Sequence, residues 1–151
     1  TVFGVGRFRY SDGFSGGGNS AIHARHLNGF RPGQWGLNLP PRGAGRIVYR
    51  FEASDGGVFK TAVLTSPKIA FDEDQLSNAI EIRSPATAGE KFVSLARNQN
   101  LENVKRDFDL SRIVADVPWF ELRISARNQS KITRLSLVSF GVRGEVVQKR
   151  D

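Results

Sequence analysis

The stretch from residue 119 to residue 147 constrains the fold more than any other part of the chain. In its first half, polar or charged residues alternate with four apolar residues, Phe120, Leu122, Ile124 and Ala126. A period of two is typical of a β-strand with one buried face. The polar run at 128–131 predicts a reversal, so that the stretch forms a long hairpin. Such a hairpin is stable only against a second layer, which the rest of the chain must supply.

The returning half of this stretch changes its parity. Leu135 and Leu137 share one parity, whereas Val138, Phe140 and Val142 share the other. A shift of this kind within one strand indicates either a β-bulge or a strand that is apolar on both faces.

Further strands are predicted along the rest of the chain, separated by turns rich in Gly, Pro and Asp. They cover residues 2–10, 21–25, 35–39, 45–52, 59–71, 76–84 and 91–97. Ser66-Pro67 predicts a bulge or an edge position within its strand. Residues 100–114 fit a helix or a strand, and we favour a strand because the surrounding segments are strands. The pattern predicts an all-β fold, an antiparallel β-sandwich or jelly roll.

Length and composition place this sandwich in one domain and exclude several classes of site. A chain of 151 residues suits a single domain over 1–151, and because it begins at Thr1 we expect a domain excised from a larger multidomain protein. The absence of cysteine excludes disulfides, thiolate metal sites and cysteine nucleophiles. No apolar run approaches the roughly 20 residues of a membrane-spanning helix, so we expect no membrane partner.

The positive charge of the chain is concentrated in its first third. The net charge is +7, and residues 1–50 contain seven Arg, no Lys and one acid, Asp12. This excess indicates a solvated surface, a contact with neighbouring domains of the same polypeptide, or a surface for an anionic ligand. Nucleic acid is disfavoured as a partner, because the chain lacks interleaved aromatic residues and a recognition helix.

A candidate ligand-binding site lies in the Gly- and Pro-rich segment of this basic third. Sugar sites combine a flat aromatic ring with side chains that bond hydroxyl groups, on loops held by a rigid sheet. Trp35 could supply the ring, with Arg31, Asn38 and Arg42 as polar partners. Alternatively, Trp35 is buried and anchors its loop. For Trp119, which follows Pro118, a core or edge-capping position is favoured.

The remaining motifs do not indicate catalysis or a metal pair. His23 and His26 would face opposite sides of a strand and could not share a metal ion. No serine lies in a nucleophile-elbow motif, and no glycine run fits a phosphate-binding loop. We therefore expect a protein that is not an enzyme, with no catalytic residues.

Five segments resemble the galactose-binding-like β-sandwich of discoidin-type domains and carbohydrate-binding modules. They are residues 10–15 (YSDGFS), 45–51 (GRIVYRF), 78–84 (NAIEIRS), 92–95 (FVSL) and 119–125 (WFELRIS). The resemblance implies an accessory domain of an exported bacterial protein, extracellular or periplasmic. It also implies one structural calcium ion, for which Asp12 is the matched candidate ligand.

The resulting hypothesis is a non-catalytic carbohydrate-binding module, with an acidic polysaccharide as candidate ligand. The alternative is a structural or interaction domain that packs against a neighbouring domain and has no ligand of its own.

Overall fold

In the computed structural model of this chain, residues 1–13, 24–33, 36–71, 77–98, 101, 106–128 and 135–149 are described. Strands dominate this part of the chain, joined by a 3-10 turn and one turn of α-helix. The elements are β1 (Val2–Phe3), β2 (Gly6–Gly13), β3 (His26–Asn28), β4 (Arg31–Gly33), β5 (Gly36–Leu39), β6 (Ala44–Ala53), β7 (Gly57–Phe71), β8 (Asn78–Arg83), η1 (Ala88–Glu90), β9 (Val93–Arg97), β10 (Phe108–Asp109), α1 (Ser111–Val114), β11 (Trp119–Arg127) and β12 (Leu135–Gln148).

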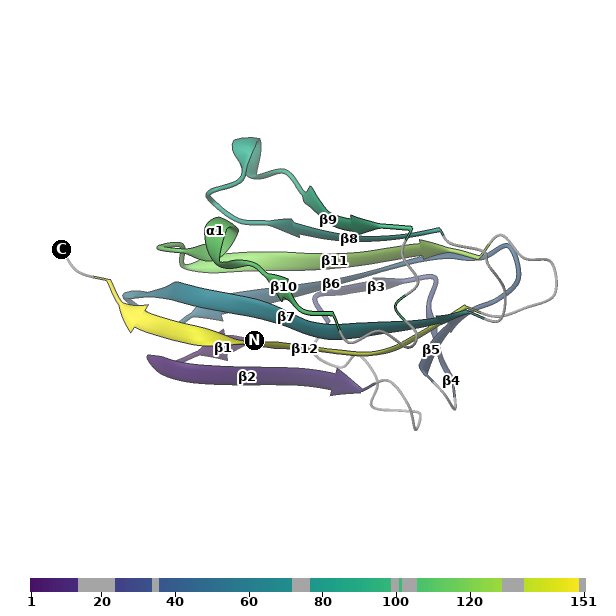
Figure 1. Ribbon diagram of the computed structural model, residues 1–151, viewed down its shortest axis with the longest axis horizontal. Coiled ribbons are helices and arrows are strands. Elements are labelled where there is room, and N and C mark those ends of the chain that lie inside the picture. The colour runs from purple at the N-terminus through teal and green to yellow at the C-terminus, as the bar shows by residue number, and fades with distance from the viewer. Residues whose placement is uncertain are drawn as a thin grey trace.

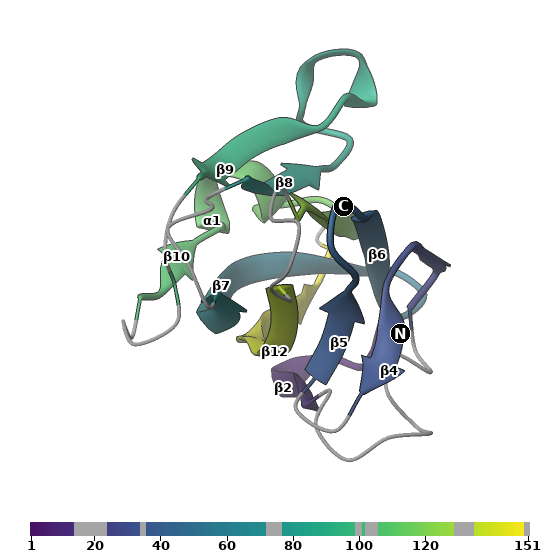
Figure 2. The ribbon, with the colours of Figure 1, turned by 90° about the vertical axis from the view of Figure 1, so that its right-hand side faces the viewer.

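The described strands form two sheets that run along the long axis of the molecule (Figure 1). Sheet A has the order β1-β6-β11-β8-β9, and β3 also pairs with β6. Sheet B has the order β10-β7-β12-β5-β4, and β2 also pairs with β12. Figure 2, which looks from the end that carries β4 and β5, shows the two layers facing each other. The predicted all-β sandwich is confirmed, and it is the architecture implied by the resemblance to galactose-binding-like domains.

The core between the sheets is rich in aromatic side chains. Phe120 of β11 packs edge-on against Phe59 of β7, with ring centres 4.9 Å apart, and so joins the two sheets. Phe51 lies 5.1 Å from Phe120 and packs edge-on against Tyr10 of β2. Aromatic pairs of this geometry stabilise a core beyond the area they bury. Ile47, Tyr49 and Phe51 are all buried, which confirms the predicted face of their strand.

The strand facings predicted from alternation are also confirmed elsewhere in sheet A. Four alternate residues of β11 are at most 6% exposed, namely Phe120, Leu122, Ile124 and Ala126. In β8, Ile80 and Ile82 are buried while Glu81 and Arg83 are half-buried on the other face.

The predicted hairpin between residues 119 and 147 is wrong. β11 pairs with β6 and β8 in sheet A, whereas β12 pairs with β7, β2 and β5 in sheet B. The connection between them therefore crosses from one layer to the other. The buried face of β11 obtains its second layer from sheet B, where Phe59 of β7 packs against Phe120.

Bulges account for the parity shift and for the Ser66-Pro67 signal. The register between β12 and β7 shifts between Leu137 and Ser139, which leaves Val138 as an extra residue. It shifts again between Ser139 and Gly141, where two residues of β7, Ser66 and Pro67, oppose the single residue Phe140 of β12. Ser66 has a φ of 37°, and β7 continues through the bulge without a break. A β-bulge was one of two alternatives predicted for the parity shift at Leu137 and Val138 and for Ser66-Pro67, and it is confirmed at both places.

Two predicted segments differ from the structure. Residues 100–114 were favoured as a strand, but the described part forms a two-residue strand, β10, followed by the helical turn α1. The strand expected at 21–25 lies mostly outside the described residues, and the adjoining strand is β3, which begins at His26. Neither helical segment in the described residues is long and apolar enough to cross a membrane.

Candidate binding face

The outer face of sheet A carries seven arginines in the described part of the chain. We call it the arginine face; its arginines are Arg25, Arg46, Arg50, Arg83, Arg97, Arg123 and Arg127. Six of them lie on strands, each next to at least one buried residue in sequence, so the alternation of side chains directs them outward. Arg25 lies just before β3, and its backbone N–H donates to the carbonyl oxygen of Val48 at 2.8 Å.

Glu121 is the centre of the arginine face. In register it lies opposite Arg50 on β6 and opposite Arg83 on β8. Its carboxylate pairs with Arg83, lies 2.8 Å from Nη1 of Arg25 and lies 3.8 Å from Nη1 of Arg50. Glu121 is 1% exposed, whereas the three arginine side chains are 27% to 51% exposed. The buried carboxylate therefore fixes three half-exposed guanidinium groups at the surface.

Two aromatic rings lie beneath these arginines. The guanidinium of Arg50 lies 4.2 Å from the ring centre of Trp119, and that of Arg123 lies 4.0 Å from the ring centre of Phe92. Arg83 lies between the rings, 5.0 Å from Phe92 and 5.8 Å from Trp119. Trp119 is thus half-buried on the outer face and not in the core. Stacking holds the planar guanidinium groups with their N–H edges available to a ligand.

Three hollows open on the arginine face and adjoin one another. A hollow of about 470 Å³ is lined by Thr1, Arg25, Arg50 and Glu52. The next, of about 320 Å³, shares Arg25 with it and includes Phe92 and Glu121. The third, of about 630 Å³, shares His26 and Arg46 with the second and lies over Ala79 and Ser125. Together they form a groove along the strands. It runs from Glu52, where β1 pairs with β6, toward Ala44 at the start of β6.

The residues of the predicted sugar site are partly brought together, away from this groove. Arg31 of β4 lies directly opposite Asn38 of β5, so the two side chains share one face of sheet B. Arg42 is exposed in the turn Pro40–Gly43, with a φ of 60° and a hydrogen bond of 2.9 Å from Gly43 N–H to the Pro40 carbonyl. Trp35 lies outside the described residues, as does His23. Binding at this site stays a prediction.

Asp12, the predicted calcium ligand, is used inside the sandwich. Its carboxylate accepts a hydrogen bond from the hydroxyl of Tyr49 and a longer one, 3.4 Å, from that of Tyr10. Among the described residues, no group of three or more His, Asp or Glu side chains could hold a metal ion. The Asp12 carboxylate thus bonds two tyrosine hydroxyls, and the calcium site stays a prediction.

Comparison with known proteins gives two structural likenesses. No protein-family model matches the chain, and no curated protein sequence matches it. The chain is similar to a family two carbohydrate esterase from Cellvibrio japonicus, with a TM-score of 0.49 and 7% identity over 96% of this chain. It spans 36% of that esterase's length. It is also similar to the carbohydrate-binding module TmCBM61, solved in complex with β-1,4-galactotriose, with a TM-score of 0.33 and 12% identity over 96% of this chain and 88% of the module.

Neither likeness identifies a family for this chain. Because both TM-scores lie below 0.5, they assign neither a ligand nor a reaction to this chain. What the chain can bind has to be argued from its own surface.

Sequence reasoning missed most of the arginine face. It placed the contact surface in residues 1–50, but Arg83, Arg97, Arg123 and Arg127 come from later strands. The signal was present, because Arg123 and Arg127 stand on the polar parity of β11. What alternation could not show is that the polar faces of β6, β8, β9 and β11 lie side by side in one sheet.

Proposed function

We propose that this chain is a non-catalytic module that binds an acidic polysaccharide along the groove of the arginine face. One observation carries the proposal: seven arginines, with two aromatic rings beneath them, line three adjoining hollows on one side of a rigid sheet. Guanidinium groups bond carboxylate, sulfate and hydroxyl oxygens through paired N–H groups. A groove of linked hollows suits an extended chain of sugar rings better than a small compact ligand.

The acids of the groove support a binding role without a reaction. Glu121 pairs with three arginines, and Glu81 pairs with Arg123 at 3.0 Å. Glu52 accepts a hydrogen bond of 2.8 Å from Nε of Arg50. Carboxylate oxygens that bond arginine side chains in this way are occupied and are not placed to contact a reacting group of a ligand. The wider proposal, an accessory domain of an exported bacterial protein, rests on the sequence resemblance.

A glycan array at low and at physiological salt tests this function. Wild-type protein should bind acidic polysaccharides, and the signal should fall at physiological salt because exposed charges are screened over a Debye length of about 8 Å. Ser125→Tyr should abolish binding, because it places a bulky ring on the floor of the largest hollow of the groove without changing the charge. The matched control is Thr61→Tyr, at an exposed position of β7 in sheet B, which should bind as the wild type does. Absence of glycan binding in both buffers contradicts the proposal.

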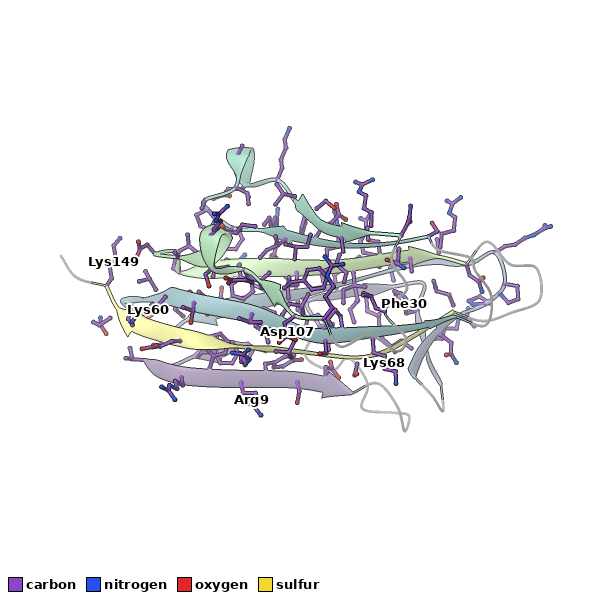
Figure 3. The ribbon with its side chains drawn as sticks, viewed as in Figure 1. Arg9, Phe30, Lys60, Lys68, Asp107 and Lys149 are labelled. Carbon is purple, nitrogen blue, oxygen red and sulfur yellow. The ribbon has the colours of Figure 1, made fainter. Side chains whose placement is uncertain are left out.

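The alternative function, an interaction domain without a ligand, is favoured by a different observation. An apolar hollow of about 930 Å³ lies at the end of the sandwich that carries Lys60 and Lys149 (Figure 3). Its lining includes Val5 and Val147, and Val5 is 58% exposed. If glycans do not bind, Val5→Asp should weaken the association of this domain with a neighbouring domain of the full-length protein, as measured by limited proteolysis of the linker between them.

A further inference from the structure

We infer that the largest hollow of the arginine face is an anion subsite that takes a sulfate ester of the bound polysaccharide. Its positively charged lining is Arg46, Arg97 and Arg127. The inference rests on the proposed function and names the ligand group that this part of the groove selects.

The register of sheet A explains why a hollow forms there. Arg46 of β6 lies opposite Ser125 of β11, and Ser125 lies opposite Ala79 of β8. Ala79 in turn lies opposite Arg97 of β9. Neighbouring strands are about 4.8 Å apart, so two small side chains form a floor between two long ones. Arg127 lies two residues after Ser125, on the same face of β11, and lines the same hollow.

Among the described residues, the positive charge of this hollow has no acidic partner, unlike that of the rest of the face. Arg25, Arg50, Arg83 and Arg123 each pair with Glu52, Glu81 or Glu121. Arg46, Arg97 and Arg127 form no ion pair with any residue in the described part of the chain, and none of the described residues that line the hollow is acidic. An anion placed among these three cations gains electrostatic attraction and hydrogen bonds from each of them.

The number and arrangement of donors favour a sulfate ester over a carboxylate. A carboxylate is planar and has two acceptor oxygens, which one arginine can satisfy through a bidentate contact. A sulfate ester has three terminal oxygens directed to different sides, which suits three guanidinium groups carried by three different strands. The lining also includes Asn28, Asn98 and Ser125, whose side chains can bond the hydroxyl groups of the same sugar.

The other half of the groove is expected to hold an uncharged sugar. There the arginines are paired with Glu52, Glu81 and Glu121, and the aromatic rings of Trp119 and Phe92 lie beneath them. The groove thus matches a polysaccharide that carries its sulfate on one residue and hydroxyl groups on the next.

The test measures the affinity of three polysaccharides by affinity electrophoresis and calorimetry. The probes are a sulfated galactan, the same galactan after chemical desulfation, and polygalacturonate as the carboxylated counterpart. Wild-type protein should bind the sulfated galactan most tightly. Arg97→Gln should weaken that binding about tenfold or more, the usual loss for a charge-assisted hydrogen bond, and should leave the desulfated galactan unaffected.

Arg9→Gln is the matched control. Arg9 is exposed on β2 of sheet B, and it projects from the lower layer in Figure 3, so the variant removes the same charge far from the hollow. Its affinity for the sulfated galactan should stay within about twofold of wild type, since distant exposed charges are screened.

The outcomes separate the subsite from the function. Equal losses in Arg97→Gln and Arg9→Gln, or equal affinity for sulfated galactan and polygalacturonate, overturn the sulfate subsite. A third outcome also overturns the subsite: the sulfated and desulfated galactans bind equally well, and Ser125→Tyr abolishes the binding. In that case the arginine face remains the binding face. If none of the three polysaccharides binds, the proposed function itself has failed.

Discussion

The hydroxyl of Tyr49 donates a hydrogen bond to the carboxylate of Asp12 across the space between the two sheets. Tyr49 belongs to β6 of sheet A and Asp12 to β2 of sheet B. Tyr10, two residues before Asp12, directs its hydroxyl to the same carboxylate. These are the only two tyrosines of the chain, so both phenols report on one contact between the layers.

We predict that neither tyrosine ionises in the folded protein, and that stability falls at alkaline pH. Burial, reinforced by the Asp12 carboxylate, raises the pKa of Tyr49 and of Tyr10 well above the usual value of about 10. Above pH 10 the unfolded chain loses protons that the folded state keeps, so the free energy of unfolding decreases as pH rises, and it is unaffected by these groups below that pH. Ultraviolet absorbance should show tyrosinate appearing together with unfolding.

Tyr49→Phe provides the control for this prediction. It should lower the free energy of unfolding near pH 7 by about 0.5–1.5 kcal/mol, because one hydrogen bond is lost. The decrease at alkaline pH should also become shallower, since one linked group is gone. A gradual tyrosinate signal near pH 10 in the folded wild-type protein contradicts the raised pKa values.

The core should be sensitive to truncation at Leu122. This residue of β11 is 1% exposed and faces the inter-sheet core. Leu122→Ala should lower the free energy of unfolding by about 2–5 kcal/mol, the range for a large-to-small change that leaves a cavity. Chemical denaturation measures it. Thr61→Ala, at an exposed position of β7, serves as the control and should change stability by about 0.5 kcal/mol or less.

The facing of Leu122 could be predicted from the sequence, whereas its strand partners could not. Alternation identifies the buried side of a strand because successive side chains point to opposite faces. It contains no information on which sheet the next strand joins, so β11 and β12 were expected to pair when they lie in different layers. The same side of β11 is buried whether β12 pairs with it in one sheet or lies in the opposite sheet, so the facing does not distinguish the two arrangements. Residues 100–114 show a second limit: β10 and α1 are too short to give a clear period.

Glu121 should be important for stability despite its position on the outer face. Glu121→Gln removes the charge that three arginines share, and it should lower the free energy of unfolding by about 1–3 kcal/mol. The estimate stays well below that for a fully buried ion pair because the arginines are partly exposed to solvent. Urea denaturation of the purified variant gives the value.

Glu52→Gln is the matched control for Glu121→Gln. Glu52 pairs with Arg50 on the same face, but its side chain is 42% exposed. Exposed pairs contribute about 0–1 kcal/mol, so this variant should be nearly neutral. Equal effects of the two substitutions would show that Glu121 does not act as the shared partner of the three arginines.

The arginine face illustrates what cross-strand register adds to a sequence. Glu121, Arg50 and Arg83 are far apart in the chain and adjacent in the sheet. Their types and parity could be read from the sequence, but the row they form depends on the pairing of β6, β11 and β8. The predicted set of Arg31, Asn38, Arg42 and Trp35 was local in sequence, and for that reason it could be proposed without a structure.

The final prediction compares this local site with the arginine face. If the site around Trp35 binds sugar, Trp35→Ala should weaken binding to neutral and acidic glycans alike, because an aromatic ring stacks on either. Arg31→Ala should then weaken binding to acidic glycans only, since its guanidinium pairs with the ligand charge. If the arginine face binds, both variants should resemble wild type, whereas Ser125→Tyr should lose binding to every glycan. A glycan array at low and physiological salt, with the three variants beside wild type, distinguishes the two sites. Binding that follows ligand charge and ignores all three substitutions would reduce the protein to a nonspecific basic surface.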